Sequence, residues 1–219
     1  MKISLLGGTG DIAEGLVLRW SRAGHEIYIG SRSEEKALGI AAGHAETLEG
    51  LGIESNIHGM ANADAAAASE VIIISIPPEY AAATVAGCGD SITDQIVVTP
   101  VVSMKREGKT FLFDPPAQGS SALEIKDALP ETARLVSAYH NLPAKELANI
   151  DEDLDYDVVI CGDDEGAKEV IKNLTEEMKN LRVLDAGPLE ISSMIESLTP
   201  LIVNLNVRYK PSHFSVKFV

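Results

Sequence analysis

The first half of the chain alternates short apolar runs with longer segments whose apolar residues recur every three or four positions. The apolar runs have the length and composition of strands in a parallel sheet, and the longer segments those of amphipathic helices. The predicted strands are Lys2–Leu6, His25–Gly30, Asn56–Met60, Val71–Ser75 and Gln95–Thr99. The predicted helices are 12–23, Glu34–Leu48, Ala61–Ser69 and Glu79–Ala86. This alternation predicts an α/β fold with a doubly wound, mainly parallel sheet.

After Pro100 the same alternation continues with less regular spacing. Further strands are predicted at Thr110–Phe113, Arg134–Ala138 and Asp157–Cys161, and helices at Ala122–Ala128, Glu165–Met178 and Glu190–Val207. Pro200 should bend or divide the last helix, because proline lacks an N–H group and clashes with the preceding turn. The alternation of Phe214, Val216 and Phe218 predicts a short strand over His213–Val219. The best candidate boundary is 185–188, so a large domain over residues 1–185 and a small C-terminal helical segment over residues 186–219 are expected.

A glycine-rich turn follows the first predicted strand. Its sequence, Gly7-Gly8-Thr9-Gly10-Asp11-Ile12-Ala13, leads into a helix with an apolar stripe. A strand, turn and helix of this kind direct free backbone N–H groups at a pyrophosphate. Gly8 permits the tight turn, Gly10 lets the phosphate approach, and Ala13 occupies the position of a third glycine. The large domain is therefore predicted to be Rossmann-like, with a dinucleotide bound along Gly8, Thr9, Gly10, Asp11 and Ile12.

The end of the second strand indicates which dinucleotide binds. An acidic residue there selects NAD through the ribose 2′-OH, whereas basic residues accommodate the 2′-phosphate of NADP. Here Ser31 and Arg32 end the strand, and Lys36 follows one helical turn later. Ser31 can donate a hydrogen bond, Arg32 can form a bidentate pair with a phosphate, and Lys36 adds a positive charge. These residues predict NADP; a surface Ser-Arg pair without a ligand is the alternative.

The composition argues against large anionic partners. The chain has 33 acidic and 18 basic residues and a net charge of −15, which repels nucleic acid and anionic membranes. Its apolar runs are far shorter than a membrane span, and the N-terminal run ends at Leu6, too early for a signal peptide. The two cysteines are far apart and are expected to be reduced. No nucleic-acid or membrane partner is expected, and the protein is expected to be cytoplasmic.

No side-chain acid, base or metal-ligand cluster stands out. A short-chain dehydrogenase would need a tyrosine with a lysine four residues later, and none of the five tyrosines has one. Only His140 follows a predicted strand at the edge where ligands bind, and a structural role for it is equally compatible. Two hypotheses remain: an NADP sensor without catalysis, or a reaction that needs no proton donor. Hydride exchange between two redox carriers is such a reaction.

The chain resembles the archaeal and actinobacterial NADPH:8-hydroxy-5-deazaflavin (coenzyme F420) oxidoreductases along its whole length. The resemblance begins with Leu-Leu-Gly-Gly-Thr-Gly, the Gly-His-Glu-Ile before the second strand, and the Gly-Ser-Arg at its end. It continues through Ser75-Ile76-Pro77, Val97-Val98-Thr99-Pro100 and Val136-Ser137-Ala138-Tyr139-His140. Cys161-Gly162-Asp163-Asp164, Leu184-Asp185-Ala186-Gly187-Pro188-Leu189 and Glu196-Ser197-Leu198-Thr199-Pro200-Leu201 complete it.

This resemblance implies reversible, direct hydride transfer between NADP(H) and coenzyme F420 as co-substrate, with no catalytic side chain and no metal. It implies NADP along the glycine turn and beside Ser75, with the nicotinamide near Pro78, Met104 and Ala144. The deazaflavin would stack on it near Val102, His140 and Leu142, in a cleft completed by the C-terminal segment. A homodimer joined through the apolar helix 194–207 is also implied.

Three questions stay open at this point. The anionic tail of the deazaflavin needs basic residues, and Lys105 and Arg106 are candidates, although a solvated turn is an equal alternative. An imine or ferric reductase of related fold would show the same NADP features. A non-enzymatic NADP redox sensor would bind the nucleotide without turnover.

Overall fold

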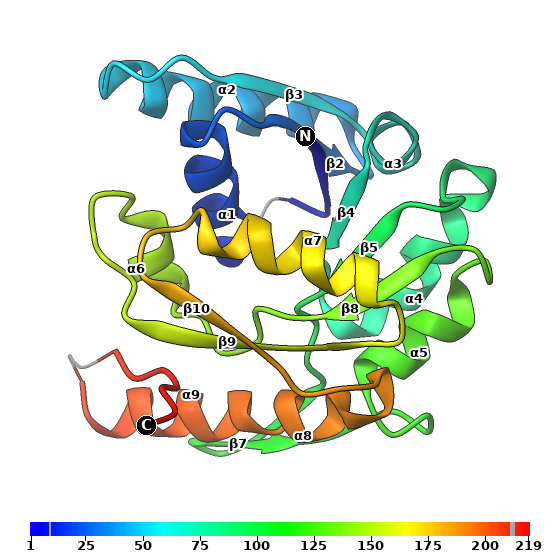
Figure 1. The fold of residues 1–219 in the computed structure, drawn as a ribbon, viewed down its shortest axis with the longest axis vertical. Helices are drawn as coiled ribbons and strands as arrows, with labels where there is room; N and C mark the ends of the chain where they lie inside the picture. The colour runs from blue at the N-terminus through cyan, green and yellow to red at the C-terminus, as the bar shows by residue number, and fades with distance from the viewer. Residues whose placement is uncertain (9, 211–212) are drawn as a thin grey trace.

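The computed structural model describes residues 1–8, 10–210 and 213–219. Within these residues, an eight-stranded sheet is covered by helices on both faces (Figure 1). Its strands are β1 (Lys2–Leu6), β2 (Glu26–Ser31), β3 (Asn56–Ala61), β4 (Val71–Ile74), β5 (Ile96–Thr99), β8 (Arg134–Ser137), β9 (Tyr156–Gly162) and β10 (Leu181–Asp185). A separate antiparallel hairpin joins β6 (Met104–Glu107) to β7 (Thr110–Phe113).

The described helices belong to both halves of the chain. They are α1 (Asp11–Arg22), α2 (Glu34–Gly50), α3 (Asn62–Ala68), α4 (Pro78–Gly87), α5 (Ser121–Ala128), α6 (Ala144–Ala148), α7 (Glu165–Glu176), α8 (Ser192–Glu196) and α9 (Leu198–Arg208). Short 3-10 turns cover Gly89–Ser91 and Leu189–Ile191. Where an element was predicted from the sequence, its bounds agree within a few residues, apart from the two C-terminal predictions described below.

The sheet has the strand order β10-β9-β8-β5-β4-β1-β2-β3, and every neighbouring pair is parallel except β8 and β9. All four residues of β4 are fully buried. Val71 and Ile73 join the apolar core on one face of the sheet, whereas Ile72 and Ile74 join the core on the other. The prediction of a doubly wound, mainly parallel α/β sheet is therefore confirmed. The sequence did not predict β6, α6 or the reversed direction of β9.

The predicted C-terminal helix is divided, as the proline suggested. The break lies at Ser197, between α8 and α9, three residues before Pro200. A proline at this position has no N–H to donate to the carbonyl of Glu196, so the hydrogen-bond ladder is interrupted there. Figure 1 shows α8 and α9 end to end along the lower edge of the view, beside β7. The side chain of Asn204 joins α9 to β7, accepting from Phe111 N at 2.9 Å and donating to Phe111 O at 2.7 Å.

The prediction of a strand over His213–Val219 is wrong. These residues form no regular element, although Asp157 N on β9 donates to Val216 O at 2.9 Å. β8 pairs with β9 only at Cys161 and Gly162, so the segment lies beside the first part of β9, but this backbone hydrogen bond is not extended into the regular ladder of a strand. Side chains bind the segment instead: Phe218 N donates to the Asp157 carboxylate, and Phe214 N donates to the Asn206 side chain.

Candidate functional site

The glycine turn after β1 lies where strand order reverses, because β1 pairs with β2 on one side and β4 on the other. Ligands of doubly wound sheets bind at such a point. Gly7 has a φ of +67°, and a Cβ there would lie 2.6 Å from a side-chain carbon of Ile76. A Cβ on Gly8 would lie 2.8 Å from Leu5 O. Gly7 therefore adopts the left-handed backbone conformation of the turn, whereas at Gly8 the neighbouring atoms leave no room for a side chain.

Gly10 is the N-cap residue of α1 and has no side chain to cap the helix. A Cβ at Gly10 would have Ser75 Oγ, at 4.0 Å, as its nearest neighbour, so this side of the turn is open. An open helix N-terminus with free N–H groups suits a phosphate, as the sequence predicted. Ile12 is partly buried against the core. Thr9 and the side chain of Asp11 lie outside the described residues.

The close approach of α1 to its neighbour depends on Gly15, which sequence reasoning missed. A Cβ at Gly15 would lie 2.5 Å from Leu147 Cγ on α6. Ala13, at the position of the third glycine in the G-x-G-x-x-G pattern, is buried in the core. The G-x-G-x-x-G pattern could not reveal this requirement, since α6 is more than 120 residues further along the chain.

A pocket of about 370 Å³ opens beside the end of β2. We call it the β2 pocket; it is lined by Gly7, Ser31, Arg32, Ser33, Lys36, Asn62, Ile76, Pro77, Tyr80 and Thr84. The three residues predicted for the NADP phosphate, Ser31, Arg32 and Lys36, are thus brought together. Ser33 Oγ accepts from Lys36 N at 3.3 Å and begins α2, which fixes the turn that carries them.

Two of the β2 pocket residues that the sequence did not predict contact the predicted ones or the glycine turn. Asn62 follows β3, and its Oδ1 accepts a hydrogen bond from Gly7 N at 3.2 Å. Tyr80, on α4, has its ring 5.7 Å from the guanidinium carbon of Arg32, within the range of a cation–π contact. Asn62 could have been found because it follows a strand at the binding edge. Tyr80 carries no comparable signal.

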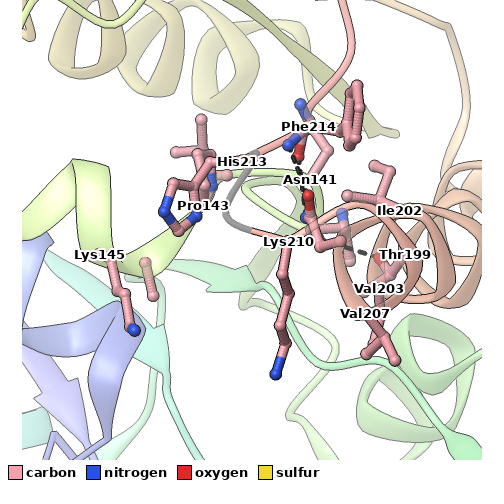
Figure 2. Close-up of a pocket in the computed structure, with 14 residues that line it drawn as sticks. Asn141, Pro143, Lys145, Thr199, Ile202, Val203, Val207, Lys210, His213 and Phe214 are labelled. Atoms are coloured by element: carbon pink, nitrogen blue, oxygen red, sulfur yellow. Dashed lines mark hydrogen bonds between the residues drawn. The ribbon is translucent and has the colours of Figure 1, made fainter. Parts of the chain in front are cut away.

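A second pocket, of about 540 Å³, lies between the end of β8 and α9 (Figure 2). We call it the α9 pocket. Its lining residues are His140, Asn141, Leu142, Pro143, Ala144, Lys145, Thr199, Ile202, Val203, Asn206, Val207, Lys210, His213 and Phe214. Three predicted site residues, His140, Leu142 and Ala144, lie in this pocket. Val102, Met104, Ser75 and Pro78 line neither pocket: Val102 is buried after β5, Met104 begins β6, Ser75 follows β4, and Pro78 begins α4.

His140 is held rigidly at the inner wall of the α9 pocket. Tyr139, just before it, is buried with a φ of +70°, a backbone conformation that costs about 1–2 kcal/mol for a residue with a side chain. The Tyr139 hydroxyl is 2.8 Å from Thr175 Oγ1, and Thr199 Oγ1 on α9 donates to His140 O at 2.9 Å. These contacts fix the backbone on both sides of His140, which lines the pocket.

The His140 imidazole is neutral at physiological pH. It is 6% exposed, and burial lowers its pKa to about 3. Nε2 lies 3.3 Å from Ser137 Oγ, whereas Nδ1 has no hydrogen-bond partner among the described residues. A neutral ring with one unused nitrogen can orient a ligand by a hydrogen bond, but it is poorly suited to deliver a proton as a cation.

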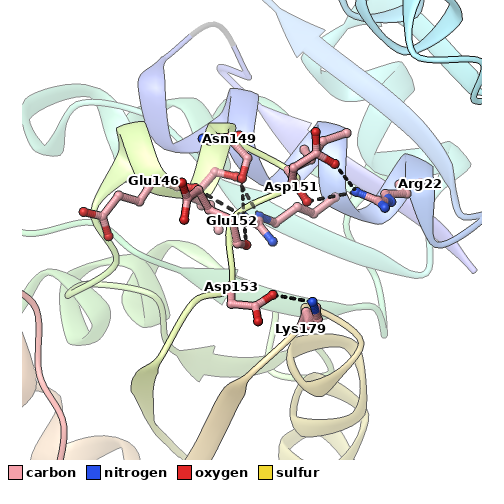
Figure 3. A network of polar contacts seen from close by, with 10 residues as sticks. Arg22, Glu146, Asn149, Asp151, Glu152, Asp153 and Lys179 are labelled. Carbon is pink, nitrogen blue, oxygen red and sulfur yellow. Dashed lines mark hydrogen bonds and ion pairs between the residues drawn. The ribbon is translucent and has the colours of Figure 1, made fainter.

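A network of polar contacts joins α1 to α6 and the segment after it, and Figure 3 shows Arg22 of α1 beside Asp151 of that segment. Arg19 of α1 is 6% exposed and donates to four backbone carbonyls, two within α6 and two after it. The two shortest of these bonds, to Leu147 O and Asn149 O, are 2.7 Å long. Arg22 adds a bond of 2.9 Å to Ile150 O. The helix that follows the glycine turn therefore also fixes α6, which begins at Ala144. Local sequence gives no sign of this contact.

The basic pair Lys105 and Arg106 lies on β6. Lys105 Nζ is 3.5 Å from Glu107 and 3.8 Å from Asp114. Arg106 donates to Gly108 O at 2.9 Å and lies over the Phe111 ring. Both charges are engaged within their own hairpin, and neither residue lines the two pockets.

Among the described residues, none of the helices has the length and apolar character needed to cross a membrane.

Comparison with known proteins identifies the family. A family model described as "NADP oxidoreductase coenzyme F420-dependent" matches residues 2–103. The chain is 39% identical over 213 residues to the F420-dependent NADP reductase of Methanocaldococcus jannaschii, covering 96% of this chain and 94% of the relative. It is 33% identical over 221 residues to the F420-dependent NADP reductase of Methanothermobacter thermautotrophicus, covering 99% and 94%.

A solved structure of a candidate F420-dependent NADP reductase from Arthrobacter sp. FB24 has the same fold, with a TM-score of 0.84 over 100% of this chain and 99% of that one. Its sequence identity of 23% supports the fold alone. Membership rests instead on the two methanogen proteins, whose similarity extends over nearly the full length of both partners. The chain therefore belongs to the family of F420-dependent NADP oxidoreductases.

Proposed function

We propose that this chain catalyses reversible hydride transfer between NADP(H) and the deazaflavin coenzyme F420. One observation carries the proposal: a basic pocket beside a glycine turn and an apolar pocket behind His140 follow parallel strands of one sheet. The carboxyl ends of parallel strands share an edge, so both pockets open toward it. The names of the methanogen relatives support the same pair of substrates and do not favour the alternatives of an imine or ferric reductase or a sensor.

NADP is proposed to bind along the glycine turn and in the β2 pocket. The open N-terminus of α1 suits the pyrophosphate, with Gly8, Thr9, Gly10, Asp11 and Ile12 as the contact segment. Ser31, Arg32 and Lys36 would hold the 2′-phosphate. The fit is supported by the crowding that excludes a side chain at Gly7 and by the two cationic side chains at the β2 pocket.

The two redox rings are proposed to meet between the glycine turn and the α9 pocket. Pro78, Met104 and Ala144 would surround the nicotinamide, and Ser75 would lie beside the NADP. Val102, His140 and Leu142 would contact the deazaflavin. When bound, the coenzymes themselves supply the carbon that gives the hydride and the carbon that accepts it.

The side chains would therefore orient the rings and exclude water rather than transfer protons. His140 would hold the deazaflavin through its unused nitrogen, and its low pKa keeps it uncharged. Apolar residues of α9, such as Ile202 and Val203, would cover the ring face. Holding two reactants in contact is by itself a large part of catalysis in such a reaction.

The organisation of the protein follows the same proposal. Residues 1–185 would form the NADP-binding domain, and residues 186–219 a small segment that completes the deazaflavin cleft. The protein is proposed to be a cytoplasmic homodimer. Exposed apolar side chains on α8 and α9 support a dimer contact there: Met194 is 70% exposed, Leu201 55% and Val207 43%.

A visible-absorbance assay tests the proposed function. NADPH and the oxidised deazaflavin coenzyme are mixed with the purified protein, and bleaching of the deazaflavin absorbance is followed. Flavin mononucleotide, Fe(III) and a cyclic imine serve as alternative acceptors. The proposal expects turnover with the deazaflavin far above that with the other acceptors. Tight NADPH binding without turnover on any acceptor would identify a sensor and refute the enzyme.

A further inference from the structure

Basic side chains surround the α9 pocket, although the chain as a whole is strongly acidic. The protein has 33 acidic and 18 basic residues. Yet the described residues that line this pocket include Lys145, Lys210 and His213 and no aspartate or glutamate. A local excess of positive charge in a chain of net charge −15 produces a potential that attracts an anion to this pocket.

The two lysines lie on opposite sides of the pocket. Lys145 is the second residue of α6, and Lys210 follows the end of α9. In Figure 2 their side chains flank the pocket and both extend toward the lower edge of the view. Both residues are exposed, and neither forms an ion pair within the part of the chain that the structure describes. By contrast, Lys126 and Lys168 each lie within 2.8 Å of an aspartate.

The inside of the pocket has a different chemistry. Leu142, Ile202 and Phe214 make most of it apolar, as a flat ring requires. Two buried polar atoms, His140 Nδ1 and Asn141 Oδ1, have no hydrogen-bond partner among the described residues. These residues are only 6% and 4% exposed, and a buried polar atom without a partner is unfavourable. Such atoms indicate a ligand that carries hydrogen-bonding groups on its ring.

We propose that Lys145 and Lys210 bind an anionic arm, made of phosphodiester or carboxylate groups, on the molecule whose ring occupies the α9 pocket. This assignment rests on the proposed function, because it takes that ring to be the deazaflavin. The other basic pair considered for this task, Lys105 and Arg106, is engaged within its own hairpin. The two lysines therefore set a preference for a deazaflavin with an anionic arm over one without it.

Steady-state kinetics with two deazaflavins test this assignment. One is the complete coenzyme with its phosphate and glutamate groups, and the other is the neutral ring with its ribityl chain alone. The variants are Lys145→Gln, Lys210→Gln and the double substitution. Lys172→Gln is the matched control, because Lys172 is a partly exposed lysine on α7 that does not line the pocket.

The double variant is expected to raise the KM for the complete coenzyme about tenfold, or about threefold for each lysine, as fits exposed ion pairs. The KM for the neutral deazaflavin and the KM for NADPH should stay at the wild-type value, and kcat should change less than twofold. Raising the salt concentration should reduce the wild-type preference for the complete coenzyme and have little effect on the double variant.

Two results would overturn the assignment. The double variant could match Lys172→Gln with the complete coenzyme, or it could raise the KM for NADPH alone, which would assign the lysines to the nucleotide phosphates. A wild-type protein that turns over neither deazaflavin would instead refute the proposed function. Titration calorimetry of the complete coenzyme into wild-type and double-variant protein then decides the lysine assignment without turnover: a tenfold weaker Kd supports it, and equal Kd values reject it.

Discussion

Replacing Arg32 by alanine tests whether the β2 pocket selects NADP over NAD. Arg32 and Lys36 are exposed cationic side chains that line this pocket, and Arg32 lies over the Tyr80 ring, so its guanidinium is partly ordered before the ligand binds. A charge-assisted pair contributes about 1.5–3 kcal/mol. Solvent exposure and the remaining Lys36 favour the low end, about 1.5 kcal/mol, or about a tenfold loss in affinity.

The assay compares kcat/KM for NADPH and NADH with the deazaflavin as acceptor. Arg32→Ala should lower kcat/KM for NADPH about tenfold and leave the value for NADH nearly unchanged, because NADH has no 2′-phosphate to lose. Arg134→Ala is the control. Arg134 is the first residue of β8, at the end of the strand away from the proposed ligand site, and it donates to Asp94 O. An equal loss for both nucleotides would refute the assignment of Arg32 to the 2′-phosphate.

Three further predictions concern Tyr80, Gly15 and His140. Tyr80→Ala should raise the KM for NADPH about two- to fivefold by freeing Arg32, and Tyr80→Phe, which keeps the ring face, should not; equal effects of the two would argue against the cation–π contact. Gly15→Ala should destabilise the protein by about 1–3 kcal/mol in urea unfolding, because the new Cβ would lie 2.5 Å from a side-chain carbon of α6. Gly39→Ala, with open space around its Cβ position, should be neutral or stabilising, and a Gly15 variant as stable as this control would contradict the packing argument. Because burial lowers the pKa of His140 to about 3, the unfolded chain takes up a proton below pH 6.5 that the folded protein does not. The stability that His140 contributes is therefore present above pH 6.5 and lost as the pH falls toward 3, by about 2 kcal/mol at pH 5. His140→Gln should remove this part of the acid destabilisation in urea unfolding at pH 7 and pH 5, and an unchanged pH dependence would show that the imidazole is accessible to water.

Local sequence determined the NADP half of the site. The strand, glycine turn and helix at residues 2–22 are contiguous, and their conformations follow from residue type and apolar periodicity. Ser31, Arg32 and Lys36 lie within one turn after a strand, so their side chains converge without any distant partner. The positive φ, however, falls on Gly7, where a Cβ would also lie 2.6 Å from Ile76 after β4, a contact that local sequence does not reveal.

The tertiary structure alone decided the α9 pocket. The α9 pocket joins His140 to residues of α9 about 60 positions later, and no periodicity specifies that pairing. The alternation of Phe214, Val216 and Phe218 predicted a strand, but the segment is bound to β9 through one backbone hydrogen bond and the Asp157 carboxylate rather than through a regular ladder. Likewise, nothing in the sequence distinguishes Lys105 from Lys210 as a ligand-binding lysine. The fold pairs Lys105 with Glu107 and Asp114, and it places Lys210 at the α9 pocket. Periodicity and turn chemistry act over a few residues, whereas strand pairing, charge pairing and cavities depend on which distant elements meet.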